Sequence, residues 1–138
     1  MFELICTLRA SQLFLHQAHL LAKGVVFMQD HEMLGDMYSA LESDFDALSE
    51  ELIGLGGENQ LKLQAVMVKV VEKLSNVPSV GVKENKEFFK TQLEFEKSIC
   101  SQVEQLCKTE LGQGTKQLLG DIAKTSNSRQ YKIKRRIG

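Results

Sequence analysis

The segment "HQAHLLAKGVVFMQDHEMLGDMYSALESDFDALSEELIGLGG" (residues 16–57) contains all three histidines of the chain and a dense set of carboxylates. Apolar residues recur at helical spacing from about Asp30 to Ile53, and "GLGG" then ends the pattern. The predicted core stripe of this helix comprises Leu34, Met37, Leu41, Phe45, Leu48 and Leu52. The preceding residues 2–22 show the same periodicity and are followed by a basic residue and a glycine. Two long helices joined by a short loop pack as an antiparallel hairpin, so this segment predicts a helical fold.

The remaining residues supply the other helices that such a hairpin needs. Residues 58–81 are rich in valine, but a lone strand would have no partner in this chain, so we expect a short connecting helix that ends before Pro78. A third long helix is predicted over residues 83–111 and a fourth from Thr115 to Ile137. The inner side of the third helix comprises Phe89, Leu93, Glu96, Ile99, Val103 and Leu106. Four long helices with a long crossover after the second predict an all-α, ferritin-like four-helix bundle with a short helix in the crossover.

Composition limits the class of protein. With 138 residues, of which 43% are hydrophobic, the chain has the size of a single domain, residues 1–138, with one core. No apolar run reaches the roughly 20 residues that a membrane span needs, and the first residues lack the features of a secretory signal. We therefore expect a cytoplasmic protein with no membrane partner. Three cysteines, an odd number, do not make a disulfide framework and predict reduced thiols.

Charge is divided unevenly along the chain. Residues 124–138, "KTSNSRQYKIKRRIG", carry six Lys or Arg and no acid, whereas the other 123 residues hold 11 basic and 18 acidic groups, a balance of −7. A basic C-terminal tail of this kind can bind the phosphate backbone of DNA. The same charge can instead stabilise a helix C-terminus, and composition leaves both interpretations open.

The histidines and carboxylates form a pattern that indicates metal chemistry. His31, Asp46 and Glu50 share one face of the second helix. In the hairpin, His19 stands opposite residues 34–36, and Asp46 lies roughly 15 to 18 Å further along the bundle, at about 1.5 Å per residue. One chain therefore cannot hold an ion between His19 and Asp46.

A two-fold dimer removes this obstacle. If the second helices of two chains cross near Tyr38–Leu41, the acids of one chain meet the histidines of the other, twice over by symmetry. The residues concerned are His19, His31, Asp46 and Glu50. Mixed imidazole and carboxylate ligands suit iron or zinc. The spacing thus predicts two metal sites per dimer, each shared between the chains.

These residues also carry a resemblance to a known family. "QAH" (17–19), "HEML" (31–34), "DALSE" (46–50) and "LGG" (55–57) resemble the metal-site region of the Dps mini-ferritins, the DNA-binding proteins from starved cells, and "GTKQLLGDIAK" resembles that family's fourth helix. The resemblance implies a dodecameric hollow shell built from two-fold dimers. It also implies intersubunit ferroxidase sites that oxidise iron(II) with hydrogen peroxide or dioxygen and store ferric mineral, which protects against oxidative damage. Carried over by position, the iron ligands are His19, His31, Asp46 and Glu50.

The chain departs from the family at particular positions. The family usually has an acid four residues after the second histidine, where this chain has Gly35 followed by Asp36. Because one residue turns a helical side chain by about 100°, Asp36 replaces that ligand only with local distortion. Leu20 stands where the family often has a redox-active Trp. The resemblance also implies that Asp121 lines a pore through which iron passes.

Rival interpretations stay open at this point. A structural or DNA-compacting shell protein with the same fold and weak or no ferroxidase activity is credible because Gly35 removes a ligand. A ferritin-like bundle that binds no metal is the third interpretation, after the mini-ferritin and the shell protein. For His16, Glu42 and Asp36, an ordinary solvated or hydrogen-bonded position outweighs a metal-binding role.

Overall fold

A computed structural model describes residues 1–77 and 84–138, and within them the chain is helical with no strand. The elements are α1 (Phe2–Leu21), α2 (Phe27–Gly54), the short 3-10 turn η1 (Glu58–Leu61), α3 (Leu63–Ser75), α4 (Asn85–Cys107) and α5 (Gln113–Ile137). The all-α prediction is confirmed. Pro78 and the predicted start of the third long helix at residue 83 lie outside the described residues. No helix in the described ranges is long and apolar enough to cross a membrane.

Several helix limits differ from the expected ones, among them the start of α5, which lies at Gln113 and not at Thr115. Two of the differences have clear local reasons. α2 begins earlier than periodicity indicates because Gly24, with φ +92°, turns the chain sharply and a new helix can start soon after it. The third long helix was expected to reach residue 111, but α4 ends at Cys107. The backbone N–H and the hydroxyl of Thr109 both donate to the carbonyl of Leu106 and close the last turn.

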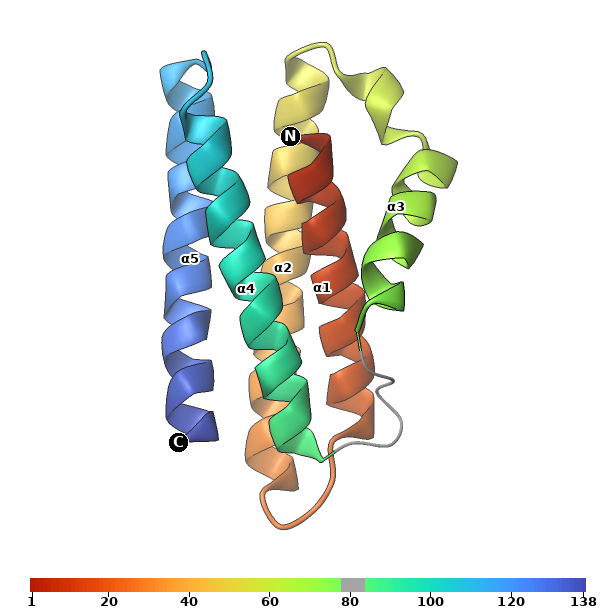
Figure 1. Ribbon diagram of the computed structural model, residues 1–138, viewed down its shortest axis with the longest axis vertical. Helices are drawn as coiled ribbons and strands as arrows, with labels where there is room; N and C mark the ends of the chain where they lie inside the picture. Colours follow the sequence, from red (N-terminus) through yellow and green to blue (C-terminus); the bar gives the residue numbers. More distant parts are fainter. Residues whose placement is uncertain (78–83) are drawn as a thin grey trace.

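The long helices pack as two hairpins (Figure 1). α1 and α2 form one antiparallel pair, α4 and α5 form the other, and these two pairs make the most extensive helix contacts. α3 packs against α1 on the outside of the bundle. Figure 1 shows that α3 runs back along the bundle after α2, so that α2 and α4 point in the same direction.

α1 is the most enclosed helix because α2, α3 and α4 all contact it. Leu4, Ile5 and Leu8 are fully buried on one side of the helix, and Cys6 and Ala10 are fully buried on the opposite side. The core stripe predicted for α2 is confirmed, with Phe45 only partly buried. Its buried members are Leu34, Met37, Leu41, Leu48 and Leu52. Each fully buried aliphatic side chain contributes about 1.5 to 3 kcal/mol of transfer free energy, and these contacts position the α1–α2 hairpin.

A charged network crosses the core. The carboxylate of Glu96 on α4 is fully buried and accepts hydrogen bonds from Gln92 at 2.7 Å and Ser126 at 2.6 Å. It also accepts one from Nε of Arg129 on α5 at 2.7 Å, and Arg129 reaches Asp44 of α2 at 3.4 Å. Burial raises the pKa of Asp44, and the charge of Arg129 opposes that rise. The predicted inward position of Glu96 is confirmed, and this network connects α2, α4 and α5.

A second network fixes one end of the bundle. Asp30, near the start of α2, is 1% exposed and forms a two-pronged ion pair with Arg136 of α5 at 2.7 and 2.8 Å. Asn85, the first residue of α4, donates to the same carboxylate at 2.9 Å and also bonds the backbone of Lys23. Burial disfavours the ionised form of Asp30, but the hydrogen bonds from Arg136 and Asn85 outweigh it and lower the pKa of Asp30.

The basic C-terminal tail is the second half of a helix. Residues 124–137 continue α5, and Ile133 is buried in the core. Arg129 and Arg136 are engaged in the ion pairs just described. The other cations of the tail are exposed: Lys124, Lys132, Lys134 and Arg135. DNA binding through this segment stays a prediction, and it would depend on those side chains.

Replacing Arg129 by Leu should lower the free energy of unfolding by about 3 to 5 kcal/mol, because it leaves the buried carboxylate of Glu96 and the half-buried carboxylate of Asp44 without a cation. Urea unfolding followed by circular dichroism measures this change. The matched control is Lys97→Leu, which removes the exposed ion pair with Glu94 and should cost less than about 1 kcal/mol. Equal losses in the two variants would show that the core network contributes nothing beyond a surface pair.

The Asp30–Arg136 pair should make stability depend on pH in a defined direction. Because the folded chain lowers the pKa of Asp30, the pair adds stability above the ordinary value of 3.8, and this is lost as the pH falls through the lowered pKa. Arg136→Met should therefore unfold about 1.5 to 3 kcal/mol more easily at neutral pH, since a hydrogen bond to a charged group is lost. Urea unfolding at successively lower pH should show the difference from the unmodified chain shrinking below pH 3.8. A difference that stays constant down to acid pH would contradict this account of the pair.

Candidate metal site on the α1–α2 hairpin

Two histidine rings lie face to face where α1 meets α2. His19, in the last turn of α1, and His31, near the start of α2, stack with ring centroids 3.7 Å apart and planes inclined by 20°. Nδ1 of His19 donates to the backbone carbonyl of His31 at 2.6 Å, and Nδ1 of His31 donates to the carbonyl of His19 at 2.8 Å. Each helix thus holds the histidine of the other through a reciprocal pair of hydrogen bonds.

These bonds decide which ring nitrogens remain available. A carbonyl oxygen only accepts hydrogen bonds, so Nδ1 of each ring must carry the proton. In the neutral imidazole, Nε2 of each ring then keeps a lone pair. Metal-binding histidines are usually oriented in this way, by a hydrogen bond from the other ring nitrogen to a carbonyl or carboxylate. His19 and His31 therefore present two oriented ligand atoms.

Gly35 makes the position of His19 possible. A Cβ atom at Gly35 would lie 3.1 Å from both Cε1 and Nδ1 of His19, which is tighter than an ordinary van der Waals contact. The prediction that His19 stands opposite residues 34–36 is confirmed by this contact. Sequence reasoning treated Gly35 only as a missing acid, whereas the structure also gives it a packing role.

The acids expected to complete the site stand elsewhere on α2. Asp46 and Glu50 are both exposed. Asp46 lies about 16 Å further along α2 than Gly35, at a rise of ~1.5 Å per residue. Because His19 packs against Gly35, Asp46 is about as far from His19 along the bundle. Within residues 1–77 and 84–138 of one protomer, no group of three His, Cys, Asp or Glu side chains is placed to hold a metal ion. One protomer thus brings the two histidines together without the carboxylates.

The less certain candidates occupy other surfaces. Asp36 is exposed and lines a groove of about 290 Å³ between α2 and α5, together with Glu32 and Lys132, whereas the histidine pair lies between α1 and α2. Glu42 is exposed on α2, and Asp121 is exposed on α5. The roles predicted for Asp36 as a ligand and for Asp121 as a pore residue stay predictions.

Sequence reasoning missed the aromatic surroundings of the pair. Tyr38 and His19 meet edge to face, with centroids 5.3 Å apart, and Tyr38 stacks on His16, with centroids 4.3 Å apart. Phe27 lies 5.0 Å from His31 on the other side. Phe27 and Tyr38 stand four residues before and seven after His31 in the sequence. Since that spacing keeps side chains on one helix face, helical periodicity could have identified both.

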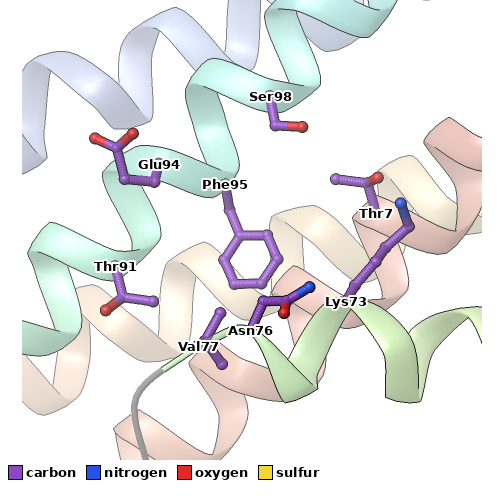
Figure 2. Close-up of a pocket in the computed structure, with 8 residues that line it drawn as sticks. All are labelled: Thr7, Lys73, Asn76, Val77, Thr91, Glu94, Phe95 and Ser98. Carbon is purple, nitrogen blue, oxygen red and sulfur yellow. The ribbon is translucent and has the colours of Figure 1, made fainter.

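A separate groove lies between α1, α3 and α4, away from the histidines. The groove has a volume of about 330 Å³, and Figure 2 shows that the ring of Phe95 points toward Asn76 and Val77 in it. Its lining residues are Thr7, Lys73, Asn76, Val77, Thr91, Glu94, Phe95 and Ser98. Lys73 already pairs with Glu3 at 3.0 Å. None of these residues belongs to the histidine pair, so the groove takes no part in the candidate metal site.

Comparison of the chain with protein-family models and with curated proteins finds no match to either. The resemblance to the Dps proteins therefore depends on the sequence motifs quoted above.

A substitution at Gly35 tests its packing role. Gly120 is the matched control, because it lies within α5 with open space around its Cα, and Gly120→Ala should stabilise the protein by about 0.5 to 1 kcal/mol through helix propensity. Gly35→Ala should gain less than this or lose stability, since the new methyl group must displace the ring of His19. Urea unfolding measures both changes. Equal stabilisation by the two substitutions would show that the ring is not held against Gly35.

Proposed function

We propose that this chain is a Dps-type mini-ferritin that binds iron(II) at sites shared between two protomers, oxidises it, and stores the ferric product in a hollow shell. The observation that carries the proposal is the reciprocal His19–His31 pair. Its hydrogen bonds leave Nε2 of both rings as ligand atoms, and no structural need of the hairpin uses those atoms.

The helix arrangement supports the ferritin-like class. The chain forms two antiparallel hairpins, and the segment that contains α3 connects the second long helix to the third. This is the topology of a four-helix bundle with one long crossover. In this chain the bundle centre is filled by the ion pair of Arg129 and Glu96. A metal site is therefore better placed at the surface of the α1–α2 hairpin than inside the bundle.

A second protomer would supply the missing carboxylates. A two-fold axis near Tyr38–Leu41 places Asp46 and Glu50 of each chain beside the histidines of its partner. Exposed apolar side chains favour such a contact, because they gather at both ends of the hairpin. At the α1–α2 turn they are Leu20, Val25, Val26 and Met28, and at the other end, where α2 passes into α3, they are Ile53, Leu55 and Leu63. The same axis brings the apolar group at the α1–α2 turn of each chain toward the apolar group at the other end of its partner's hairpin.

Iron(II) is the substrate that this ligand set suits best. Imidazole nitrogen and carboxylate oxygen together bind iron while leaving positions open to an oxidant such as hydrogen peroxide or dioxygen. Gly35 contributes no ligand, so the site holds one iron more readily than two. Removal of iron(II) from solution would limit the formation of hydroxyl radicals from peroxide and protect the cell.

The second candidate is a structural or DNA-compacting shell with weak oxidase activity. It would use the same bundle and the exposed cations of the last turns of α5, among them Lys132, Lys134 and Arg135. The absence of an acid at Gly35 favours it. Iron oxidation by the assembled protein separates the two candidates, because only the first requires the histidine pair.

Complementation between two inactive variants tests the shared site. His19→Ala and Asp46→Asn should each abolish rapid iron(II) oxidation. When the two chains are mixed and reassembled, half of the dimers are mixed, and each of these contains one site with both residues intact. About a quarter of the unmodified activity should therefore return. Stopped-flow absorbance of ferric iron after anaerobic loading with iron(II) and addition of peroxide measures the rate.

The matched control mixes His19→Ala with His31→Ala. Both residues of the pair come from the same protomer, so every site in these mixtures still lacks one imidazole and no activity should return. Recovery in this control, or none in the first mixture, would contradict a site made of histidines from one chain and acids from the other.

A further inference from the structure

The aromatic rings of the hairpin form one continuous array. Phe27 contacts His31, His31 stacks on His19, His19 and Tyr38 meet edge to face, and Tyr38 stacks on His16. The centroid separations along this series are 5.0, 3.7, 5.3 and 4.3 Å. All three histidines of the chain belong to it. Only the α1–α2 hairpin contributes its members, so the array does not depend on a second protomer.

Tyr38 is the redox-active member of the array. Phenylalanine and imidazole rings are much harder to oxidise than phenol. The chain has no Trp and only two Tyr, of which Tyr131 is 65% exposed on α5. Tyr38 is half-buried in the single chain and meets His19 edge to face with centroids 5.3 Å apart, which places its ring next to a proposed iron ligand. It is the one aromatic side chain at the histidine pair that can give up an electron readily.

The proposed reaction needs one more electron than a single iron(II) supplies, and Tyr38 can give it. One iron(II) supplies one electron, whereas the reduction of hydrogen peroxide to two water molecules consumes two. If a site holds a single iron, the second electron must come from elsewhere, or a hydroxyl radical is released. Gly35 leaves the site without a ligand for a second iron. The shortage of one electron therefore follows from the sequence of this chain.

We propose that Tyr38 supplies the second electron, an inference that rests on the proposed function. In the step, Fe(II), the phenol of Tyr38, hydrogen peroxide and one proton give Fe(III), the Tyr38 phenoxyl radical and two water molecules. The O–O bond of peroxide breaks, the iron and the phenol each lose one electron, and the phenolic proton ends in water. A later iron(II) restores the phenol by giving one electron while a proton returns from solvent. Tyr38 is then a catalytic residue that keeps the oxidation from releasing hydroxyl radicals.

The two tyrosines of the chain allow a matched test. The full-length assembled protein is loaded anaerobically with iron(II), mixed with hydrogen peroxide, frozen rapidly and examined by electron paramagnetic resonance. A tyrosyl radical should form in the unmodified protein and in Tyr131→Phe, and should be missing from Tyr38→Phe. In a parallel spin-trapping assay, Tyr38→Phe should release several-fold more hydroxyl radical per iron oxidised. Phenylalanine keeps the ring contacts with His16 and His19, and Tyr38→Trp should restore a radical of indole type.

The outcomes separate this inference from the function on which it rests. Iron oxidation without a tyrosyl radical, or with a radical that disappears only in Tyr131→Phe, would overturn the role of Tyr38 and leave the ferroxidase proposal standing. If the unmodified protein neither binds nor oxidises iron(II), both proposals fall. If the unmodified protein forms the radical, Tyr38→Phe oxidises iron but forms none, and its hydroxyl-radical yield rises, Tyr38 is the electron donor.

Discussion

The reciprocal hydrogen bonds between His19 and His31 are the constraint on which the candidate site depends. The carbonyl of His19 lies in the last turn of α1, where backbone carbonyls lack helical partners, and the ring of His31 satisfies it. The ring of His19 in turn bonds the carbonyl of His31 and packs against Gly35. One arrangement therefore closes the hairpin, fixes both ring orientations and determines which nitrogen of each ring stays free.

The two ionic networks explain how this hairpin keeps its place relative to the rest of the bundle. Asp30 lies one residue before His31, and its ion pair with Arg136 ties the start of α2 to the end of α5. Arg129 connects α5 to Glu96 of α4 and to Asp44, two residues before Asp46 on α2. Buried charges of this kind add less to stability than apolar packing of the same volume would, but each tolerates only one alignment of the helices. We infer that they set the register in which α2 presents its outer face.

Helical periodicity was enough to predict the long helices, the core stripe of α2, the inward position of Glu96 and the placement of His19 opposite Gly35. Those features follow from about 3.6 residues per turn and from a short loop between antiparallel helices. The stacking of the histidine rings could not be predicted, because it depends on side-chain rotamers and on which carbonyls lack partners. The number of free charges on the basic tail could not be predicted for a similar reason. Composition counts charges but does not show that Arg129 and Arg136 are neutralised by acids distant in sequence.

The central claim is that imidazoles of one protomer and carboxylates of its symmetry mate bind one metal ion. The most direct measurement is the anomalous diffraction of crystals soaked with iron(II) or cobalt(II) without oxygen. We expect a peak about 2.1 Å from Nε2 of His19 or His31, as for other metal–imidazole bonds, with Asp46 or Glu50 of a second chain as its further ligands. A peak ligated by one chain alone, or no peak at the histidine pair, would contradict the claim.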